Sequence, residues 1–194
     1  STASELAQTS KAVDAAVATQ SAYNAQLAGL QASKLALETE KKAYTDAGIE
    51  AQYEQINESF ASVRNMASGY GMDASAYPAD ISDALKSPKK LEALTAFMKQ
   101  IGQSDAAASL TTDNLKQLDQ IVNTRLPQID TELANLAVEI QAAQAIADQV
   151  NEQVKAAADN YEALESGKIS AAVGFSAGAA QIADGQAALS NSEE

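Results

Sequence analysis

An unbroken heptad repeat in the last third of the chain constrains its fold more than any other feature. From Leu126 to Leu189, core-type residues recur every three and then four positions. One register comprises Leu126, Leu133, Ile140, Ala147, Val154, Tyr161, Lys168, Phe175, Ile182 and Leu189, and the other Ile129, Leu136, Ala143, Val150, Ala157, Leu164, Ala171, Gly178 and Gly185. A 3.5-residue repeat keeps one stripe of an underwound helix against a partner, which is typical of a left-handed coiled coil. We therefore expect a long helix over residues 128–194, about 100 Å at 1.5 Å per residue.

Residues 1–67 carry a second and weaker repeat. Its registers are Leu6, Val13, Gln20, Leu27, Lys34 and Lys41, and Ala16, Tyr23, Leu30, Leu37 and Tyr44. Polar residues in such a stripe cost stability but can fix the register of two paired helices. At Gly48 the pattern slips, and a glycine inside a helix permits a bend or a break at that point.

The three prolines, Pro78, Pro88 and Pro127, lie between the two repeats, where they interrupt regular helix. Residues 1–67 and 128–194 therefore form two arms of equal length around a central segment, 68–127. No run of alternating β-branched residues predicts a strand. The sequence predicts an all-α fold, a long antiparallel coiled-coil hairpin with a small helical head at its tip.

Capping residues predict the helices of the head. We expect a loop from residue 68 to Pro78, a helix over 81–86 capped by Asp80 or Ser82, and a helix from Pro88 to about Gln100 that Gly102 ends. Thr112 is expected to cap another helix, and Pro127 either to kink it or to begin the second arm afresh. The predicted core of the head comprises Phe60, Val63, Leu91, Leu94, Phe97, Leu115, Leu118 and Val122.

Composition disfavours most kinds of chemistry. The chain has no His and no Cys, so neither the usual acid–base and zinc-binding side chain nor a thiol is available. We expect no enzyme, cofactor or metal site. The net charge of −13 repels nucleic acid and anionic lipid, so no nucleic-acid partner is expected. Alanine supplies 43 of the 194 residues, which favours long helices with thin cores.

The head carries the candidate contact residues. We expect Tyr70, Met72 and Tyr77 to be exposed at the tip, with Lys86, Lys89 and Lys90 nearby. Aromatic and methionine side chains are favoured in protein interfaces. The alternative is that the aromatic residues belong to the packing of the head itself. Self-association is also open, because a coiled-coil stripe can be satisfied between chains.

The stretch from Tyr161 to Leu189 resembles heptad segments in the extracytoplasmic parts of certain bacterial membrane proteins. It contains Leu164-Glu165-Ser166-Gly167-Lys168 and the Ala/Gln-rich run 179–189. It is similar to inserts of Gram-positive hydrophobe/amphiphile efflux transporters of the resistance-nodulation-division type, and also to the phage-infection-protein (YhgE-like) family and some FtsX-type permeases. The efflux resemblance implies proton-driven export by a membrane-embedded parent protein, and it carries no functional residue over to this segment.

These observations predict a non-enzymatic extracytoplasmic arm of a membrane transport protein, which assembles with or contacts an envelope partner. The start at Ser1 and a repeat that ends close to Glu194 suggest a segment of a longer chain. Two alternatives stay open. One is a surface receptor or adhesion module whose head binds an external ligand, and the other is the helical hairpin of an export adaptor.

Overall fold

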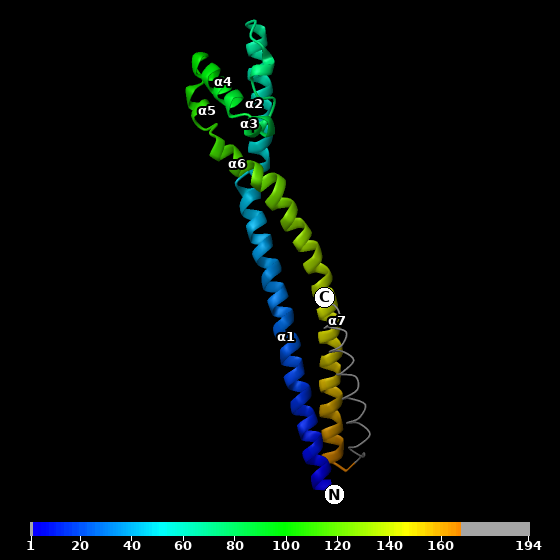
Figure 1. Ribbon diagram of the computed structural model, residues 1–194. Helices are drawn as coiled ribbons and strands as arrows, with labels where there is room; N and C mark the ends of the chain where they lie inside the picture. Colours follow the sequence, from blue (N-terminus) through cyan, green and yellow to red (C-terminus); the bar gives the residue numbers. More distant parts are fainter. Residues whose placement is uncertain (1, 168–194) are drawn as a thin grey trace. The chain divides into compact units, whose positions relative to one another are not determined.

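The structure, a computed structural model, describes residues 2–167, which form helices and connecting turns without a strand among them (Figure 1). The elements are α1 (Thr2–Asp46), α2 (Ile49–Gly69), the 3-10 turn η1 (Ala74–Ala76), α3 (Ile81–Lys86), α4 (Pro88–Gln100), α5 (Ser104–Ala108), α6 (Thr112–Gln120), the π-helical segment η2 (Ile121–Arg125) and α7 (Leu126–Glu165). The predicted all-α class is confirmed. The heptad positions from Lys168 onward, Gly178 and Gly185 among them, lie outside the described residues.

The chain divides into two compact units. We call the described residues 2–37 and 133–167 the arm unit, and residues 38–132 the head unit. Helices α1 and α7 each contribute residues to both units. The head unit is broader than the predicted head of residues 68–127, because α2 packs its buried face into the same core as α3 and α4.

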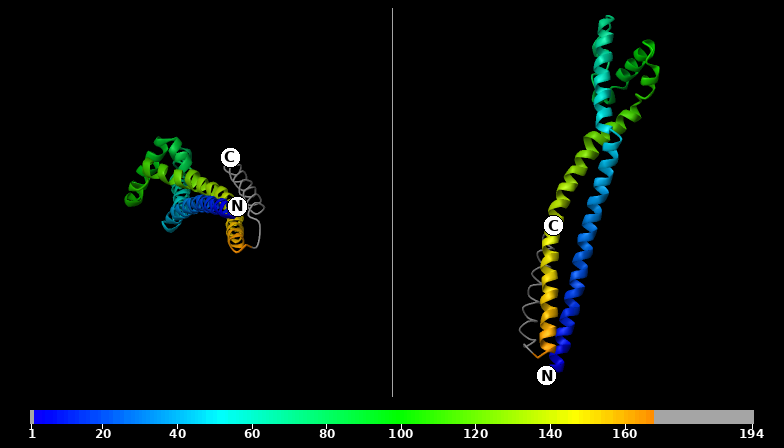
Figure 2. Two further views of the ribbon diagram at one scale, coloured as in Figure 1. Left: turned by 90° about the horizontal axis from the view of Figure 1, so that it is seen from below. Right: turned by 180° about the vertical axis from the view of Figure 1, so that it is seen from behind.

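In the arm unit, α1 and α7 form an antiparallel pair. The N-terminal end of α1 lies beside the C-terminal end of α7, and the two helices run side by side in both figures (Figures 1 and 2). The buried cluster between them comprises Tyr23, Leu27, Ala143, Ile146, Ala147 and Val150, with Leu30 and Ile140 packed against it. Apart from Ile146, all of these occupy positions of the predicted registers. The repeat therefore identifies the paired faces of both helices.

Small side chains make the interface of the arm unit thin. Ala143 and Ala147 are buried in it, and Ala16 is buried two turns of α1 before Tyr23. One polar pair crosses it, in which Gln20 Nε2 donates to Asn151 Oδ1 at 2.8 Å. Gln20 is one of the polar register positions in the first repeat. An amide pair of this kind favours one alignment of the two helices over its neighbours.

The head unit has a larger core between α2 and the short helices α3 to α6. It comprises Phe60, Val63, Ala67, Tyr77, Ile81, Ala84, Leu91, Leu94, Phe97, Met98, Ala107, Leu110 and Leu115. Six of the eight predicted core residues are in this cluster. The other two, Leu118 and Val122, are half-buried. Leu118 faces a groove, and Val122 lies in the π-helical segment, where the α-helical phase is lost.

Local signals set the helix ends of the head much as predicted. The Asp80 carboxylate accepts the Asp83 N–H at 2.8 Å and caps α3. Pro88 is the first residue of α4, and Gly102 ends that helix with a φ of +84°, a value that favours glycine. The cap of α6 is Thr111, not Thr112: the Thr111 hydroxyl accepts the Asn114 N–H at 3.1 Å, one residue before the expected position.

The helix irregularities predicted at Gly48 and at Pro127 have different outcomes. At Gly48, with a φ of +66°, helix α1 gives way to α2 after a two-residue turn. At Pro127 the helical run from α6 through η2 into α7 is unbroken, so the second arm does not begin afresh at the proline. The Leu126 N–H donates to the Ile121 carbonyl five residues back. This π turn displaces the carbonyls just before the proline, where the ring would clash in an α-helix.

Two ion pairs inside the head unit join the end of α1 to η2 and to the start of α7. The Arg125 guanidinium binds Glu40 with two hydrogen bonds, Nε to Oε2 and Nη2 to Oε1, the latter at 2.7 Å. Lys41 Nζ lies 2.6 Å from Asp130 Oδ1. Hydrogen bonding by Arg125 lowers the pKa of the Glu40 carboxyl, and hydrogen bonding to Asp130 raises the pKa of Lys41. Opposite charges therefore help to hold Glu40 and Lys41 of α1 against Arg125 and Asp130.

Candidate contact surface

The exposed large hydrophobic residues of the head unit gather where α2 ends. They are Met66, Tyr70 and Met72, with exposed fractions of 39%, 70% and 39%. Met66 and Tyr70 are four residues apart and share a face of the helix. The Met72 N–H donates to the Ala67 carbonyl at 3.0 Å, so the chain folds back over the last turn of α2. We call these three residues the Met–Tyr patch.

Gly71 makes this reversal possible. Its φ is +82°, in the left-handed region that side chains with a Cβ adopt at a cost. The Gly71 N–H donates to the Ser68 carbonyl at 3.0 Å and closes the turn. Met72 is thereby brought next to the helix that carries Met66 and Tyr70.

Aromatic packing supports the patch from below. Phe97 of α4 is buried, and the Tyr70 ring meets it edge-on with the centroids 6.1 Å apart. The Tyr77 ring packs on the same phenylalanine at 5.8 Å, and its hydroxyl donates to the Met72 sulfur at 3.1 Å. Tyr77 is itself buried. The expectation that Tyr77 is exposed is therefore wrong, and the alternative that it packs within the head is correct.

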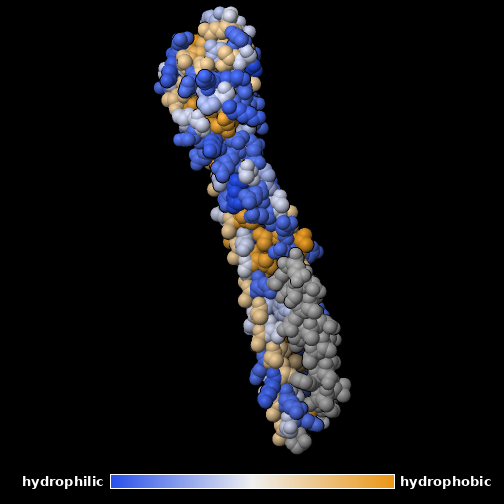
Figure 3. Space-filling view, in the orientation of Figure 1, coloured by the Kyte–Doolittle hydropathy of each residue, from blue (hydrophilic) through white to orange (hydrophobic). Residues whose placement is uncertain are grey.

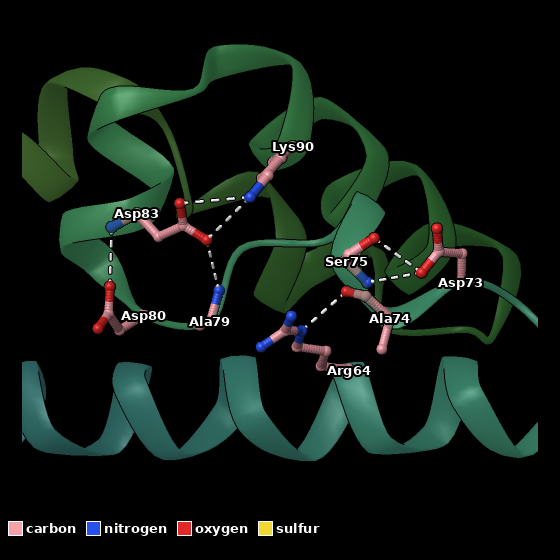
Figure 4. Close-up of polar contacts among 8 residues, drawn as sticks. All are labelled: Arg64, Asp73, Ala74, Ser75, Ala79, Asp80, Asp83 and Lys90. Carbon is pink, nitrogen blue, oxygen red and sulfur yellow. Dashed lines mark hydrogen bonds and ion pairs between the residues drawn. The ribbon is translucent and has the colours of Figure 1, made fainter.

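Polar contacts fix the loop from residue 71 to residue 80 against α2 (Figure 4). Arg64 points from α2 toward the loop, and its Nε donates to the Ala74 carbonyl at 2.7 Å. Asp73 Oδ1 accepts the hydroxyl and the backbone N–H of Ser75, at 2.8 and 3.0 Å. The Ser75 hydroxyl, followed by its N–H, lowers the pKa of Asp73. These bonds hold the first half of the loop.

The second half of the loop is held at the corner of α3 and α4. The Ala79 N–H donates to Asp83 Oδ2 at 3.0 Å, and Lys90 Nζ lies 3.4 Å from the same oxygen. The Ala79 N–H is the main cause that lowers the pKa of Asp83. The Ile81 N–H is accepted by the Asn57 side chain of α2 at 2.8 Å. The carboxylates of Asp80 and Asp83 thus accept hydrogen bonds from backbone N–H groups, and they are not arranged as an acid–base pair.

The lysines predicted for the surface lie apart from the aromatic residues. Lys90 is half-buried beside Asp83, whereas Lys86 and Lys89 are exposed at the end of α3 and the start of α4. Figure 4 shows Lys90 and Asp83 at one end of the loop and Asp73 at the other. Lys90 also precedes Phe97 by two turns of α4, about 10 Å of helix. The structure therefore brings together Tyr70, Met72 and Tyr77, whereas Lys90 is paired with Asp83.

Met66 and the supporting role of Phe97 were not predicted from the sequence. The i, i+4 spacing of Met66 and Tyr70 was the available signal for the first. No local signal identifies Phe97 as the support for two tyrosines, because that contact depends on how α4 packs against α2.

A groove of about 360 Å³ lies elsewhere in the head unit, between α2 and the α5–α6 region. It is lined by Ile49, Gln52, Ile56, Ser109, Asn114, Gln117, Leu118 and Ile121. The Ser109 hydroxyl donates to the Ala106 carbonyl, and no charged side chain lines the groove to activate it. In the part of the chain that is described, no three His, Cys, Asp or Glu side chains are grouped as metal ligands.

Neither the hydropathy of the surface nor the comparison with known proteins adds a residue to the candidate contact surface. On the face drawn in Figure 3, the head unit shows mainly hydrophilic residues with small apolar areas between them. Between residues 2 and 167, no helix combines the length and the apolar character that crossing a membrane requires.

Comparison of the chain with protein-family models, curated proteins and solved structures finds no match. The resemblance of residues 161–189 to transporter inserts stays a prediction from sequence, and residues 168–189 of that stretch lie outside the described part.

Proposed function

We propose that the head unit contacts another protein through the Met–Tyr patch, and that the chain is a non-enzymatic, extracytoplasmic arm of a bacterial membrane transport protein. One observation carries the contact role: Met66, Tyr70 and Met72 are exposed together on a support formed by Phe97 and Tyr77. The location and the transport parent rest on the sequence resemblance alone.

The charges around the patch favour a protein partner. In residues 59–79 the only charged side chains are Arg64 and Asp73, one of each sign. The whole head unit, residues 38–132, has nine Lys and Arg against fifteen Asp and Glu, a balance of −6. An acidic unit is repelled by anionic lipid and by nucleic acid. An apolar protein surface without negative charge fits a neutral patch on such a unit.

The size and rigidity of the patch suggest the kind of contact. Three side chains cover far less than the roughly 800 Å² per partner of a stable interface. The patch is therefore a small anchor within a larger or a short-lived contact. Because Tyr70 is held by Phe97, little side-chain freedom is lost on binding, which favours Tyr70 as the central contact residue.

The arm unit supplies a spacer in this proposal. Residues 2–37 of α1 extend over about 54 Å at 1.5 Å per residue, and α7 runs antiparallel to them along the buried cluster. Paired helices resist bending better than a single helix of the same length. The arm unit thus acts as a spacer of fixed length, and the Met–Tyr patch makes the contact with the partner.

Site-specific photo-crosslinking tests the contact role. A benzophenone amino acid in place of Tyr70 is expected to yield a discrete crosslinked product in cells that make the full chain. The same probe in place of Lys89, which is also exposed in the head unit, is expected to yield none. Equal products from both positions, or none from position 70, would contradict the proposal. A product that forms only after an external ligand is added would favour the receptor alternative instead.

Thermal melting supplies the control for folding. Tyr70→Ser removes a residue that is 70% exposed and should leave the melting temperature nearly unchanged. Tyr77→Ser removes a buried ring and its hydrogen bond to Met72, so it should lower the melting temperature clearly. A large fall in the melting temperature of the Tyr70→Ser variant would show that Tyr70 stabilises the core of the head unit and does not contact a partner.

A further inference from the structure

We propose that Met66 and Met72 form an oxidation site, at which a peroxide converts the Met–Tyr patch from an apolar into a polar surface. The chemical claim rests on the exposure of the two methionine residues and on the hydrogen bond to the Met72 sulfur. Its consequence for a partner rests on the contact role proposed above.

The three methionines of the chain differ sharply in their surroundings. Met66 and Met72 are each 39% exposed, whereas Met98 is 3% exposed in the core of the head unit. Oxidation of a thioether requires that the oxidant reach the sulfur. The two methionines of the patch are therefore open to a dissolved peroxide, and Met98 is shielded within the same unit. Met98 is an internal control.

The reaction is a two-electron transfer of oxygen. A lone pair of the methionine sulfur attacks one oxygen of hydrogen peroxide, the S–O bond forms and the O–O bond breaks. The leaving hydroxide takes up the proton and becomes water, so the sulfur is oxidised and the peroxide is reduced. The product is methionine sulfoxide, which methionine sulfoxide reductases return to methionine. The change is thus reversible.

Hydrogen bonding distinguishes the two exposed sulfurs. The Tyr77 hydroxyl donates to the Met72 sulfur at 3.1 Å and so occupies one of its lone pairs. In the described residues no hydrogen bond is made to the Met66 sulfur. At equal exposure, Met66 should therefore react faster than Met72. After oxidation, the sulfoxide oxygen is a stronger acceptor than a thioether, and it makes each side chain polar.

Peptide mass spectrometry after peroxide treatment of the full chain tests the site. We expect Met66 and Met72 to gain oxygen about tenfold faster than Met98, because exposure controls access to the sulfur. Tyr77→Phe should raise the rate at Met72 several-fold and leave the rate at Met66 unchanged. Similar rates at all three methionines, or no effect of Tyr77→Phe at Met72, would overturn the proposal.

Hydrophobic-interaction chromatography tests the change of surface. Oxidised wild-type protein should elute earlier than untreated protein, and reductase treatment should restore the retention. The double variant Met66→Leu, Met72→Leu keeps the apolar area but has no sulfur there, so peroxide should leave its retention unchanged. An unchanged retention of doubly oxidised wild-type protein would overturn the claim that the surface becomes polar.

The same variants separate this proposal from the proposed contact. Peroxide should abolish the crosslink from position 70 in the wild-type background and spare it in the double leucine variant. If untreated protein gives no crosslink, the contact role fails. The oxidation rates and the retention still decide the oxidation site on their own.

Discussion

The arm unit and the head unit are stabilised by buried side chains of different sizes. The interface of the arm unit is built around small residues such as Ala143 and Ala147, with Tyr23 as the aromatic member of its cluster. The core of the head unit contains Phe60, Phe97 and Tyr77, which bury far more apolar area per residue. A helix pair can thus be stabilised by many small contacts along its length, whereas a compact head depends on a few bulky residues.

The polar contacts described above between one helix and another also differ between the two units. The arm unit has the neutral pair Gln20–Asn151, and the head unit has the ion pairs Arg125–Glu40 and Lys41–Asp130. Ion pairs respond to pH and salt, and a neutral amide pair does not. The two units should therefore differ in how solution conditions affect them, as well as in the size of mutational effects.

The largest effect is expected in the core of the head unit. Phe97→Ala should lower the free energy of unfolding by about 3–5 kcal/mol, because a buried ring is lost and two tyrosines lose their support. Hydrogen exchange read by mass spectrometry should show lost protection over residues 49–120 and retained protection around Tyr23. Val138→Ala, at a side chain 68% exposed, serves as the control and should change stability by less than about 0.5 kcal/mol. Equal loss of protection in both units would break the distinction between them.

A smaller effect is expected from the matching change in the arm unit. Tyr23→Ala should lower the free energy of unfolding by about 2–3 kcal/mol, because a thin interface between alanines can close partly over the space. Urea denaturation measures the total, and hydrogen exchange should place the loss in residues 9–30. An effect as large as that of Phe97→Ala would show that the arm also depends on single bulky residues.

The ion pair of Glu40 should make the head unit sensitive to acid. Because Arg125 lowers the pKa of Glu40 in the folded state, the stabilisation is complete above the ordinary value of 4.5 and is lost as the pH falls through the lowered one. Wild type should therefore resist urea better than Glu40→Gln at neutral pH, and the difference should vanish in strong acid. Gln20→Ala is the uncharged comparison, and its effect should not change over that range. A difference between wild type and Glu40→Gln that persists in strong acid would show that charge is not its source.

The smallest effect is expected at the amide pair of the arm unit. Gln20→Ala should cost about 0.5 kcal/mol, because a hydrogen bond near solvent is largely replaced by water. Asn151→Ala should cost a similar amount, and the double variant little more than either single change. Additive losses would indicate that the two side chains act independently.

Sequence patterns predicted the features that are determined within one or two helical turns. Asp80, Pro88 and Gly102 set helix ends through bonds and dihedral angles of their own neighbourhood, and they were identified correctly. The heptad registers likewise identified the faces that carry Ala16 and Val150, because burial along a paired helix follows the repeat.

Features that depend on packing between distant segments were not predictable in this way. Tyr77 lies just before a proline, where a loop was expected, and its burial depends on Phe97, twenty residues further on. Helix α5 is only five residues long and has no strong cap, so it gave no signal. The Met–Tyr patch is predicted in part: the sequence indicates Tyr70 and Met72 as contact residues at the tip, whereas Met66 joins them only because α2 ends beside them.

The π turn at residues 121–125 determines how the loss or gain of one residue would affect the continuous helix from α6 to α7. A π turn holds one residue more than the α-helical path it replaces, which is equivalent to a single-residue insertion that leaves the residues on either side in phase. Without it, one added residue would rotate the following face by about 100°. Leu115 before the turn and Ile129 after it are both fully buried. Loss of one residue here would therefore keep both faces buried, at the cost of a clash between the Pro127 ring and the carbonyl four residues before it. A deletion in the regular turns of α7 would instead rotate the buried face outward.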